Sequence, residues 1–344
     1  MKSEVITMER RSVHVDCCMR KGVWHILKKE KVLGRKKKFF SMDDFELTLL
    51  ALPTTIWYIL FTYMPMFGIL IAFKRIRAPR RGTNFLTHVL TSENAGFDNF
   101  RFVFGSRDAT LMFRNTLGYN VVFIITGLLF SVGLALMISQ LHSKKLAKVC
   151  QTAMFLPHFL SWVVVSYFVF SFLSVDKGLI NNFFAESGRD RVQWYMQPQY
   201  WPYIIVFLNL WKGTGYGMVV YLASISGIDG ALYEAAIIDG ARKFQQIKYI
   251  TLPMLKPIIL IMFILAVGRI FSTDFGLFYQ VPRNSGPLVD VTQTIDVYVF
   301  KALMGQANYG FAAAAGLLQS VFGLITILIA NGVVRKVDAE NALF

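Results

Sequence analysis

A few polar side chains stand inside long apolar segments of this chain, and their types suit the binding of hydroxyl-bearing ligands. Charge at membrane depth is costly unless the side chain faces a cavity or a partner. Sugars need hydrogen-bond donors and acceptors for their hydroxyl groups, and their apolar faces stack on aromatic rings. The candidate ligand-contacting residues are Asn209, Trp211, Lys212, Tyr216, Arg269, Thr273, Asp274 and Gln319.

Each of these residues also has a structural interpretation. Aromatic side chains in apolar segments usually face lipid or pack in the core, and a single lysine can extend to an interface. The pair Gly213 and Gly217 favours a close approach between helices. The sequence leaves both interpretations open for each residue.

A second cluster lies in the polar stretch 223–256, between the fourth and fifth apolar segments. Asp229 is placed to cap a short helix, and Gly240 is placed to end it in the left-handed conformation. A second short helix is expected to run to a boundary at Pro253. The pattern predicts either a helix–turn–helix that docks on a partner or an ordinary loop rich in good helix formers.

The first of these helices has a small-residue face. At helical spacing Leu232, Ala235, Ala236 and Asp239 fall on one side. The two alanines would let a partner approach closely, while Glu234 and Asp239 offer charged hydrogen bonds at the edge.

The chain lacks the signatures of an enzyme. It has no Gly-rich phosphate loop of the G-x-x-x-x-G-K-[ST] type, no nucleophile elbow and no carboxylate pair, so it is not expected to hydrolyse ATP. Active transport would need energy from another subunit or from an ion gradient. Asp274 is the only carboxylate deep inside a predicted span, whereas proton relays usually use several, which disfavours a gradient-driven transporter.

Metal ligation, cofactor binding and disulfides are not expected either. The 5 histidines and 3 cysteines show no ligand spacing with one another. Cys17 and Cys18 are adjacent in a tail predicted to be cytosolic, where vicinal geometry and reducing conditions oppose a bridge.

Membrane-spanning helices must position these residues. The 344 residues are 55% hydrophobic, 15% aromatic and only 17% charged, which is typical of a multi-span membrane protein. Segments long enough to cross about 30 Å of hydrocarbon must be helical, because unpaired backbone is too costly in lipid. We predict an all-α integral membrane protein with six transmembrane helices, over 46–73, 117–141, 153–174, 200–222, 257–280 and 311–334.

Basic residues predict the orientation. Lys and Arg gather in the tail 1–44, after the second span, in 223–256 and after the last span, which places both termini in the cytoplasm. The basic stretch 74–81 conflicts with this, because the six-span arrangement puts it outside. The tail lacks the apolar run of a signal peptide. The net charge of +15 is explained by orientation and by attraction to anionic lipid, so nucleic-acid binding is not expected.

The spacing within 223–256 is specific. Glu-Ala-Ala, three residues, Gly, nine residues and then Ile-x-Leu-Pro resembles the EAA loop of bacterial ABC importer permeases, although Ile247 stands where that family often has an aromatic residue. The resemblance implies a coupling loop that seats in a cleft of the ATP-hydrolysing subunit. The motif residues are Glu234, Ala235, Ala236, Asp239, Gly240, Ile250, Leu252 and Pro253.

Nearly the whole chain from about residue 45 is similar to LplB-type polysaccharide-transport permeases, which belong to the MalF-like oligosaccharide importers. The segments that carry the resemblance are 65–74, 97–100, 115–117, 211–213, 221–223, 295–299 and 342–344. It implies a type I importer fold over 45–344, with 1–44 unplaced and 74–81 extracytoplasmic. That stretch is more basic than expected, so it either contacts an acidic binding protein or a uronate-bearing sugar, or forms a rim facing anionic lipid or teichoic acid.

The resemblance further implies the function. We expect a permease subunit of an ATP-driven importer for oligosaccharides or polysaccharide fragments, in the bacterial cytoplasmic membrane. The expected partners are ABC ATPase subunits, a second permease, an extracytoplasmic solute-binding protein and membrane lipids; ATP would be used by the partner alone. The alternatives are a gradient-driven sugar transporter, an ABC permease for another solute, and a sensor or scaffold that transports nothing.

Overall fold

The computed structural model describes residues 42–76, 85–105, 107–306 and 308–337, and these residues are almost entirely helical. Within them the β-structure consists of one isolated antiparallel bridge between Lys74 and Asn94. The chain divides into two compact units between Phe67 and Gly68. The predicted tail 1–44, with Cys17 and Cys18, lies almost wholly outside the described residues.

The described part of the first unit is helical and apolar, and this helical run continues past Phe67 to Phe73. α2 (Met42–Tyr58) continues through a π-helical turn, η1 (Ile59–Tyr63), into the 3-10 helix η2 (Met64–Phe73). Pro53 lies inside α2. The run Phe45–Phe73 is long and apolar enough to cross a membrane, in agreement with the predicted span 46–73.

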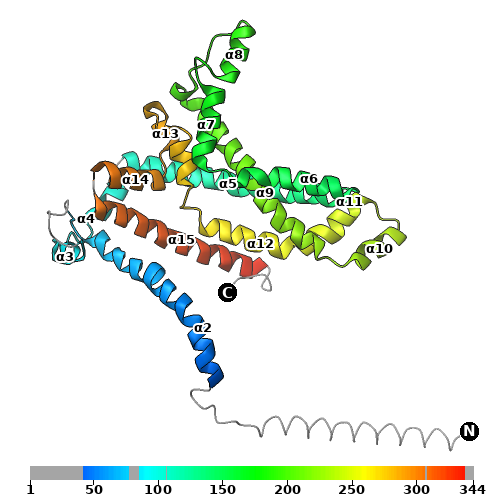
Figure 1. The fold of residues 1–344 in the computed structure, drawn as a ribbon, viewed down its shortest axis with the longest axis horizontal. Helices are drawn as coiled ribbons and strands as arrows, with labels where there is room; N and C mark the ends of the chain where they lie inside the picture. Colours follow the sequence, from blue (N-terminus) through cyan, green and yellow to red (C-terminus); the bar gives the residue numbers. More distant parts are fainter. Residues whose placement is uncertain (1–41, 77–84, 106, 307, 338–344) are drawn as a thin grey trace, which may run out of the picture. The chain divides into compact units, whose positions relative to one another are not determined.

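The second unit holds the other helices (Figure 1). Those of the first half are α3 (Phe85–Thr91), α4 (Asp98–Gly105), α5 (Arg107–Ser139), α6 (Lys144–Phe155), η3 (Leu156–Phe159), α7 (Trp162–Leu173), α8 (Leu179–Glu186), η4 (Trp194–Met196), η5 (Pro198–Tyr200) and α9 (Trp201–Ser226). Those of the second half are α10 (Gly230–Ile238), α11 (Lys243–Gln246), η6 (Ile247–Thr251), α12 (Leu252–Gly268), η7 (Gly276–Gln280), η8 (Gly286–Leu288), α13 (Val289–Thr292), α14 (Ile295–Gln306) and α15 (Tyr309–Val337).

The predicted spans map onto these helices with differences. In the described residues, 4 helices are long and apolar enough to cross a membrane, namely Phe45–Phe73, Asp108–Ser139, Lys243–Gly268 and Tyr309–Lys336. The predicted third span is a pair of helices, Lys144–Phe159 and Trp162–Leu173, bent by 98° at their junction. The predicted fourth span corresponds to α9, whose 26 residues are long enough to cross but whose middle is less apolar. The predicted count of six is therefore approximate.

The predicted fifth span, 257–280, has the wrong limits. The helix begins at Lys243 and ends at Gly268. Beyond it the chain breaks over Arg269–Asp274 before the short turn η7. The apolar content of the sequence continues through this break, so hydropathy alone did not show where the helix ends.

α9 packs closely on two neighbours (Figure 1). A Cβ on Gly217 would lie 2.5 Å from Ser131 Oγ of α5, and a Cβ on Gly215 would lie 1.9 Å from the Met154 carbonyl oxygen of α6. Gly213 has no atom within 4 Å of such a Cβ. The predicted close approach is thus confirmed for Gly217 and wrong for Gly213. The closest approach is instead at Gly215, on the side of α9 that faces α6.

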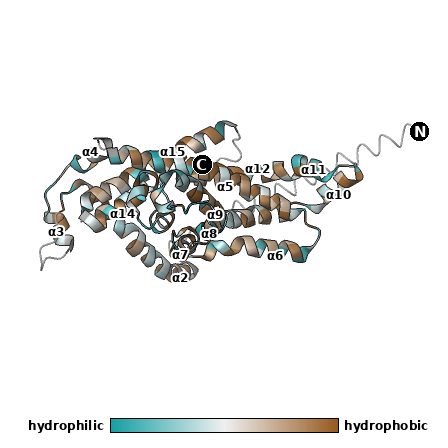
Figure 2. Ribbon diagram, turned by 90° about the horizontal axis from the view of Figure 1, so that it is seen from above, coloured by the Kyte–Doolittle hydropathy of each residue, from teal (hydrophilic) through white to brown (hydrophobic). Residues whose placement is uncertain are grey.

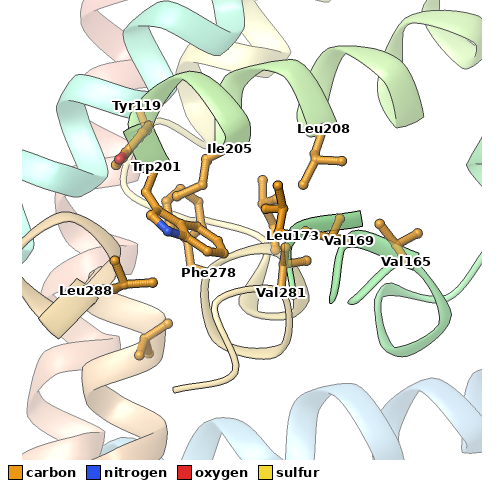
Figure 3. Packing of buried hydrophobic residues seen from close by; sticks show 12 residues of the cluster. Tyr119, Val165, Val169, Leu173, Trp201, Ile205, Leu208, Phe278, Val281 and Leu288 are labelled. Atoms are coloured by element: carbon orange, nitrogen blue, oxygen red, sulfur yellow. The ribbon is translucent and has the colours of Figure 1, made fainter. Parts of the chain in front are cut away.

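The largest buried cluster joins distant parts of the chain (Figure 3). Trp201, Ile205 and Leu208 of α9 pack against Val165, Val169 and Leu173 of α7 and against Phe278 and Val281, which follow the break. Trp201 also donates a hydrogen bond from Nε1 to the Trp194 carbonyl oxygen (2.8 Å). This cluster fixes the segment after the break against α7 and α9.

Apolar residues make up most of the long helices (Figure 2), and many of the large ones are exposed. α12 is brown along most of its length, whereas the turn near α11 carries polar residues. This distribution fits helices whose outer faces meet lipid or another protein.

Two of the basic residues after the first predicted span have local roles. Lys74 Nζ donates hydrogen bonds to the carbonyl oxygens of Leu90 (2.9 Å) and Ser92 (3.2 Å). Arg75 forms a salt bridge with Asp98 (3.1 Å). The remaining basic residues of the stretch 74–81 lie outside the described residues.

Candidate functional site

The predicted docking helix is present with the expected ends. Asp229 Oδ1 accepts a hydrogen bond from the Ala231 amide (3.0 Å) at the start of α10. At its end, Gly240 has φ +77°, and the Gly240 and Ala241 amides donate to the carbonyl oxygens of Ile237 (3.0 Å) and Ala236 (2.8 Å). This pair of bonds is a Schellman motif. The predicted roles of Asp229 and Gly240 in the helix are confirmed.

The second predicted helix does not stop at Pro253. α11, η6 and α12 form one continuous helix from Lys243 to Gly268. A π-helical turn at η6 precedes the proline, and there the Leu252 amide donates to the Ile247 carbonyl oxygen, five residues back. The wider turn makes room for the proline ring, so the helix passes a residue that usually ends one.

Hydrogen bonds hold α10 against this long helix. The hydroxyl groups of Tyr233 and Thr251 are 2.9 Å apart, and Gln246 Nε2 donates to the Ala241 carbonyl oxygen (3.1 Å). Gln245 Oε1 accepts from the Arg242 amide (2.7 Å) and caps the start of α11. The segment from α10 to η6 is therefore held in place rather than being a loose loop, and we call it the docking knob.

The exposed side of this knob is larger and more apolar than the predicted small-residue face. The exposed fractions are 86% for Ile238, 74% for Phe244, 67% for Tyr249 and 62% for Ile237. We call these four residues the apolar knob. The sequence analysis did not predict these residues as part of the docking surface. Four bulky apolar residues in an otherwise polar loop could have indicated them.

The eight motif residues lie around the apolar knob. Glu234, Ala235, Asp239, Gly240, Leu252 and Pro253 are exposed, while Ala236 and Ile250 are half-buried. The exposed Arg242, Lys243 and Lys248 add positive charge at its edge. The geometry fits a groove with an apolar floor and an acidic rim.

Two cavities with polar residues in their lining lie beside the break after α12, at the other end of the same helix. Asn120 of α5 holds the break in place, because its Nδ2 donates to the carbonyl oxygens of Ile270 (2.8 Å) and Ser272 (3.0 Å). One cavity, of about 300 Å³, lies between α5, α9 and α12. The other, of about 450 Å³, lies between the break, α14 and α15. We call them the α9 cavity and the α15 cavity.

Arg269 and Ser272 line both cavities and so stand between them. The polar lining of the α9 cavity also includes Asn120, Ser131 and Asn209. That of the α15 cavity also includes Asp296, Gln319 and Ser320. The structure thus brings together Asn209, Arg269 and Gln319 from the predicted ligand-contacting residues. Their spacing of amides, hydroxyls and one guanidinium suits a polyhydroxylated ligand.

Asp296 was not among the predicted site residues, yet it organises the α15 cavity. Its Oδ2 accepts hydrogen bonds from the Thr273 amide (2.6 Å) and hydroxyl (2.8 Å), and its Oδ1 accepts one from Gln319 Nε2 (3.1 Å). Thr273 is therefore occupied in holding the break to α14. A carboxylate at the start of the apolar run 295–300 was the signal that could have identified Asp296.

The other predicted residues lie on a different side of α9. Lys212 Nζ donates to the His158 carbonyl oxygen (2.8 Å) and lies 5.2 Å from the centre of the Trp162 ring. Tyr216 stacks on His158, with ring centres 4.8 Å apart. Both contacts are at the 98° bend between η3 and α7.

Asp274 and Trp211 also lie away from the two polar cavities. Asp274 accepts hydrogen bonds from Trp162 Nε1 and from the Gly276 amide, so it joins α7 to η7. Trp211 lines an apolar cavity with residues of α7. A ligand-contacting role for these residues and for Lys212 and Tyr216 stays a prediction.

Side chains of α5 support the segment that follows η8. Asn115 Nδ2 donates to the carbonyl oxygens of Asp290 (3.0 Å) and Gln293 (3.1 Å), and Thr116 Oγ1 accepts from the Ile295 amide (3.1 Å). Asn115 and Thr116 are both buried. They bind backbone that no helix satisfies, which fixes the start of α14 and so the position of Asp296.

Comparison with known proteins gives consistent matches. The family described as binding-protein-dependent transport system inner membrane component matches residues 127–339. Protein LplB of Bacillus subtilis is 32% identical over 295 residues, covering 86% of this chain and 90% of that protein. The polygalacturonan/rhamnogalacturonan transport system permease protein YteP of Bacillus subtilis is 32% identical over 320 residues, covering 92% of this chain and 95% of that protein.

A solved structure shares the fold. A chain of a bacterial ABC transporter involved in the import of the acidic polysaccharide alginate matches with a TM-score of 0.75 and 33% identity, covering 86% of this chain and 97% of that one. A chain from the alginate transporter in complex with an alginate pentasaccharide-bound periplasmic protein matches with the same TM-score and 34% identity, covering 86% of this chain and 96% of that one.

Proposed function

This chain belongs to the family of binding-protein-dependent transport system inner membrane components, and from that membership we propose that it is the permease subunit of an ATP-driven importer for oligosaccharides or polysaccharide fragments. It is a multi-pass membrane protein and the transport subunit of such a system rather than an enzyme. A separate ATPase supplies the energy, so the chain itself needs no cofactor.

One observation carries the proposal: a single helix joins the docking knob to the polar cavities. Its 26 residues run from Lys243, beside the apolar knob, to Gly268, beside Arg269. At 1.5 Å per residue this helix is about 39 Å long. α10 and α14 lie at opposite ends of the unit (Figure 1). A displacement at one end therefore moves the wall of both cavities at the other.

The knob is the proposed contact with the ATPase. Its motif residues and the apolar knob would enter a groove of that subunit, where burial of Ile238 and Phe244 contributes about 1.5–3 kcal/mol each. Closure of the ATPase pair then pushes the knob as a rigid body and rocks the spans between two states. The loaded binding protein must favour the same state as ATP, because coupling requires a difference in affinity between the two.

The proposal also fixes the orientation. The knob and both termini face the cytoplasm, and the segment from α3 to α4 faces outside, where a solute-binding protein docks. A second permease subunit completes the path, because the two cavities form only one side of an enclosed channel.

Reconstitution in proteoliposomes tests the proposal. The chain, its ATPase, the second permease and the binding protein should take up labelled oligosaccharide only with internal ATP. The variant Ile238→Asp should lose ATPase association, whereas Leu179→Asp, which places the same charge on exposed α8, should keep it. Uptake that persists without ATP and collapses with an uncoupler would instead support a gradient-driven transporter.

A further inference from the structure

We propose that Arg269 binds a carboxylate of the transported saccharide, which makes acidic fragments, those that carry uronate residues, the preferred substrates. The inference rests on the proposed function. It adds the charge of the substrate and the residue that binds the charged group. The position of Arg269, the state of its guanidinium and the lining of the cavities each support it.

Arg269 occupies a fixed position at the end of α12. Its backbone leaves the helical conformation, with φ −102° and ψ 14°, and its amide still donates to the Ala266 carbonyl oxygen (3.1 Å). The two hydrogen bonds from Asn120 hold the next residues. The side chain thus starts from an anchored backbone and lines both the α9 cavity and the α15 cavity.

The guanidinium has no partner within the described residues. It forms no hydrogen bond or salt bridge there, although Asp296 lines the α15 cavity beside it. The Asp296 carboxylate is already satisfied by two groups of Thr273 and by Gln319. A positive charge inside a membrane is stabilised by a counter-charge. Asp296, the carboxylate that shares the α15 cavity with Arg269, instead accepts its hydrogen bonds from Thr273 and Gln319.

Two other cations, on the neighbouring helices α9 and α5, already have partners within the protein. Lys212 is held by the His158 carbonyl oxygen and the face of Trp162. Arg114 donates to the Asp290 carbonyl oxygen at 3.4 Å, at an apolar cavity. Among the residues that line the α9 and α15 cavities in the described part of the chain, Arg269 is the one that carries positive charge.

The α9 cavity is the better place for the carboxylate. Its lining contains no acidic residue, whereas the α15 cavity contains Asp296. A guanidinium binds a carboxylate through two parallel N–H···O bonds, a geometry that lysine does not reproduce. Asn209 and Ser272 also line this cavity and carry groups that bind hydroxyls.

Direct binding to the transporter, without the binding protein, tests this inference. The full permease–ATPase complex in lipid nanodiscs is titrated with trigalacturonate and with its methyl ester, and bound sugar is followed by saturation-transfer NMR. The ester keeps the hydroxyl groups and removes the charge. The expected result is about 10- to 100-fold tighter binding of the acid than of the ester by the unmodified complex.

Two substitutions locate the effect. Arg269→Gln should bring the acid to the affinity of the ester, and Arg269→Lys should recover only part of the difference because it lacks the two-bond geometry. Arg189→Gln removes one positive charge from an exposed loop residue and should keep the full preference. Complex assembly, measured by co-elution of the ATPase, verifies the fold of each variant.

Equal binding of acid and ester by the unmodified complex would overturn the inference, and so would an unchanged preference in Arg269→Gln. If Arg269→Gln does not assemble, the comparison in the unmodified complex and Arg269→Lys still decide the question. A failure of the proposed function looks different, because it abolishes ATP-driven uptake of acidic and neutral oligosaccharides alike.

Discussion

Replacement of Gly240 by alanine should loosen the docking knob without creating any clash. Gly240 has φ +77°, and a Cβ built on it would meet no atom within 4 Å. The cost is therefore purely conformational, about 1–2 kcal/mol for a non-glycine residue in the left-handed region. Alanine also restricts the unfolded chain, which offsets about 0.4–1 kcal/mol of that cost. We expect the capped end of α10 to lose about 1 kcal/mol.

Hydrogen exchange of the two capping amides measures this loss directly. The amides of Gly240 and Ala241 are protected by the carbonyl oxygens of Ile237 and Ala236. A loss of about 1 kcal/mol corresponds to roughly fivefold faster exchange at position 240 and at Ala241. The affinity for the ATPase should fall by no more than the same factor, because only the capped fraction is competent to bind.

Gly230→Ala is the matched control for this prediction. Gly230 begins the same helix, is not in the left-handed region and also has open space around its Cβ position. Alanine there should leave exchange unchanged or slow it slightly. If both variants exchange alike, the left-handed cap is not what holds the knob, and the reasoning is refuted.

Three further predictions concern packing, hydrogen bonding and ionisation. Gly215→Ala should destabilise the permease by about 1–3 kcal/mol because its Cβ meets the α6 backbone, whereas Gly213→Ala should not; equal thermal unfolding temperatures in detergent would contradict this. Tyr233→Phe should cost about 0.5–1.5 kcal/mol, seen as faster hydrogen exchange in η6, and unchanged exchange would count against the hydroxyl contact. Burial raises the pKa of Tyr195 to about 12, and Arg283 opposes this rise only in part. Because an unfolded tyrosine ionises near pH 10, the folding stability of the native protein should fall between about pH 10 and 12. The stability of Tyr195→Phe should fall less over this range, and parallel pH profiles of the two proteins would contradict the prediction.

The sequence alone predicted the membrane class and the ends of the docking helix. Long apolar segments allow little but helices in lipid, so composition and length set the fold class. Asp229 and Gly240 act on backbone groups within a few residues of themselves, so their effect can be read from local sequence. The same is true of the spacing from Glu234 to Pro253, which belongs to one continuous stretch of chain.

Other features depended on contacts between distant parts of the chain. The end of α12 at Gly268 is set by Asn120, about 150 residues earlier, and Asp296 acts through Thr273 and Gln319 of other elements. Hydropathy averages over neighbours along the chain and cannot register such bonds, so it extended the fifth span through the break. It also could not show that Gly215, rather than Gly213, meets the backbone of α6.

The tertiary structure likewise decided which polar residues share a space. Asn209 lines the α9 cavity, Gln319 lines the α15 cavity, and Arg269 lines both. By contrast, Lys212 and Asp274 already form hydrogen bonds at the bend that contains His158 and Trp162. The residue types alone marked all five as candidate ligand contacts, and the three charged ones as costly in a membrane. A charged side chain that already forms hydrogen bonds within the protein supports the fold, whereas one without such bonds is open to a ligand. Only the tertiary structure shows which hydrogen bonds each charged side chain forms.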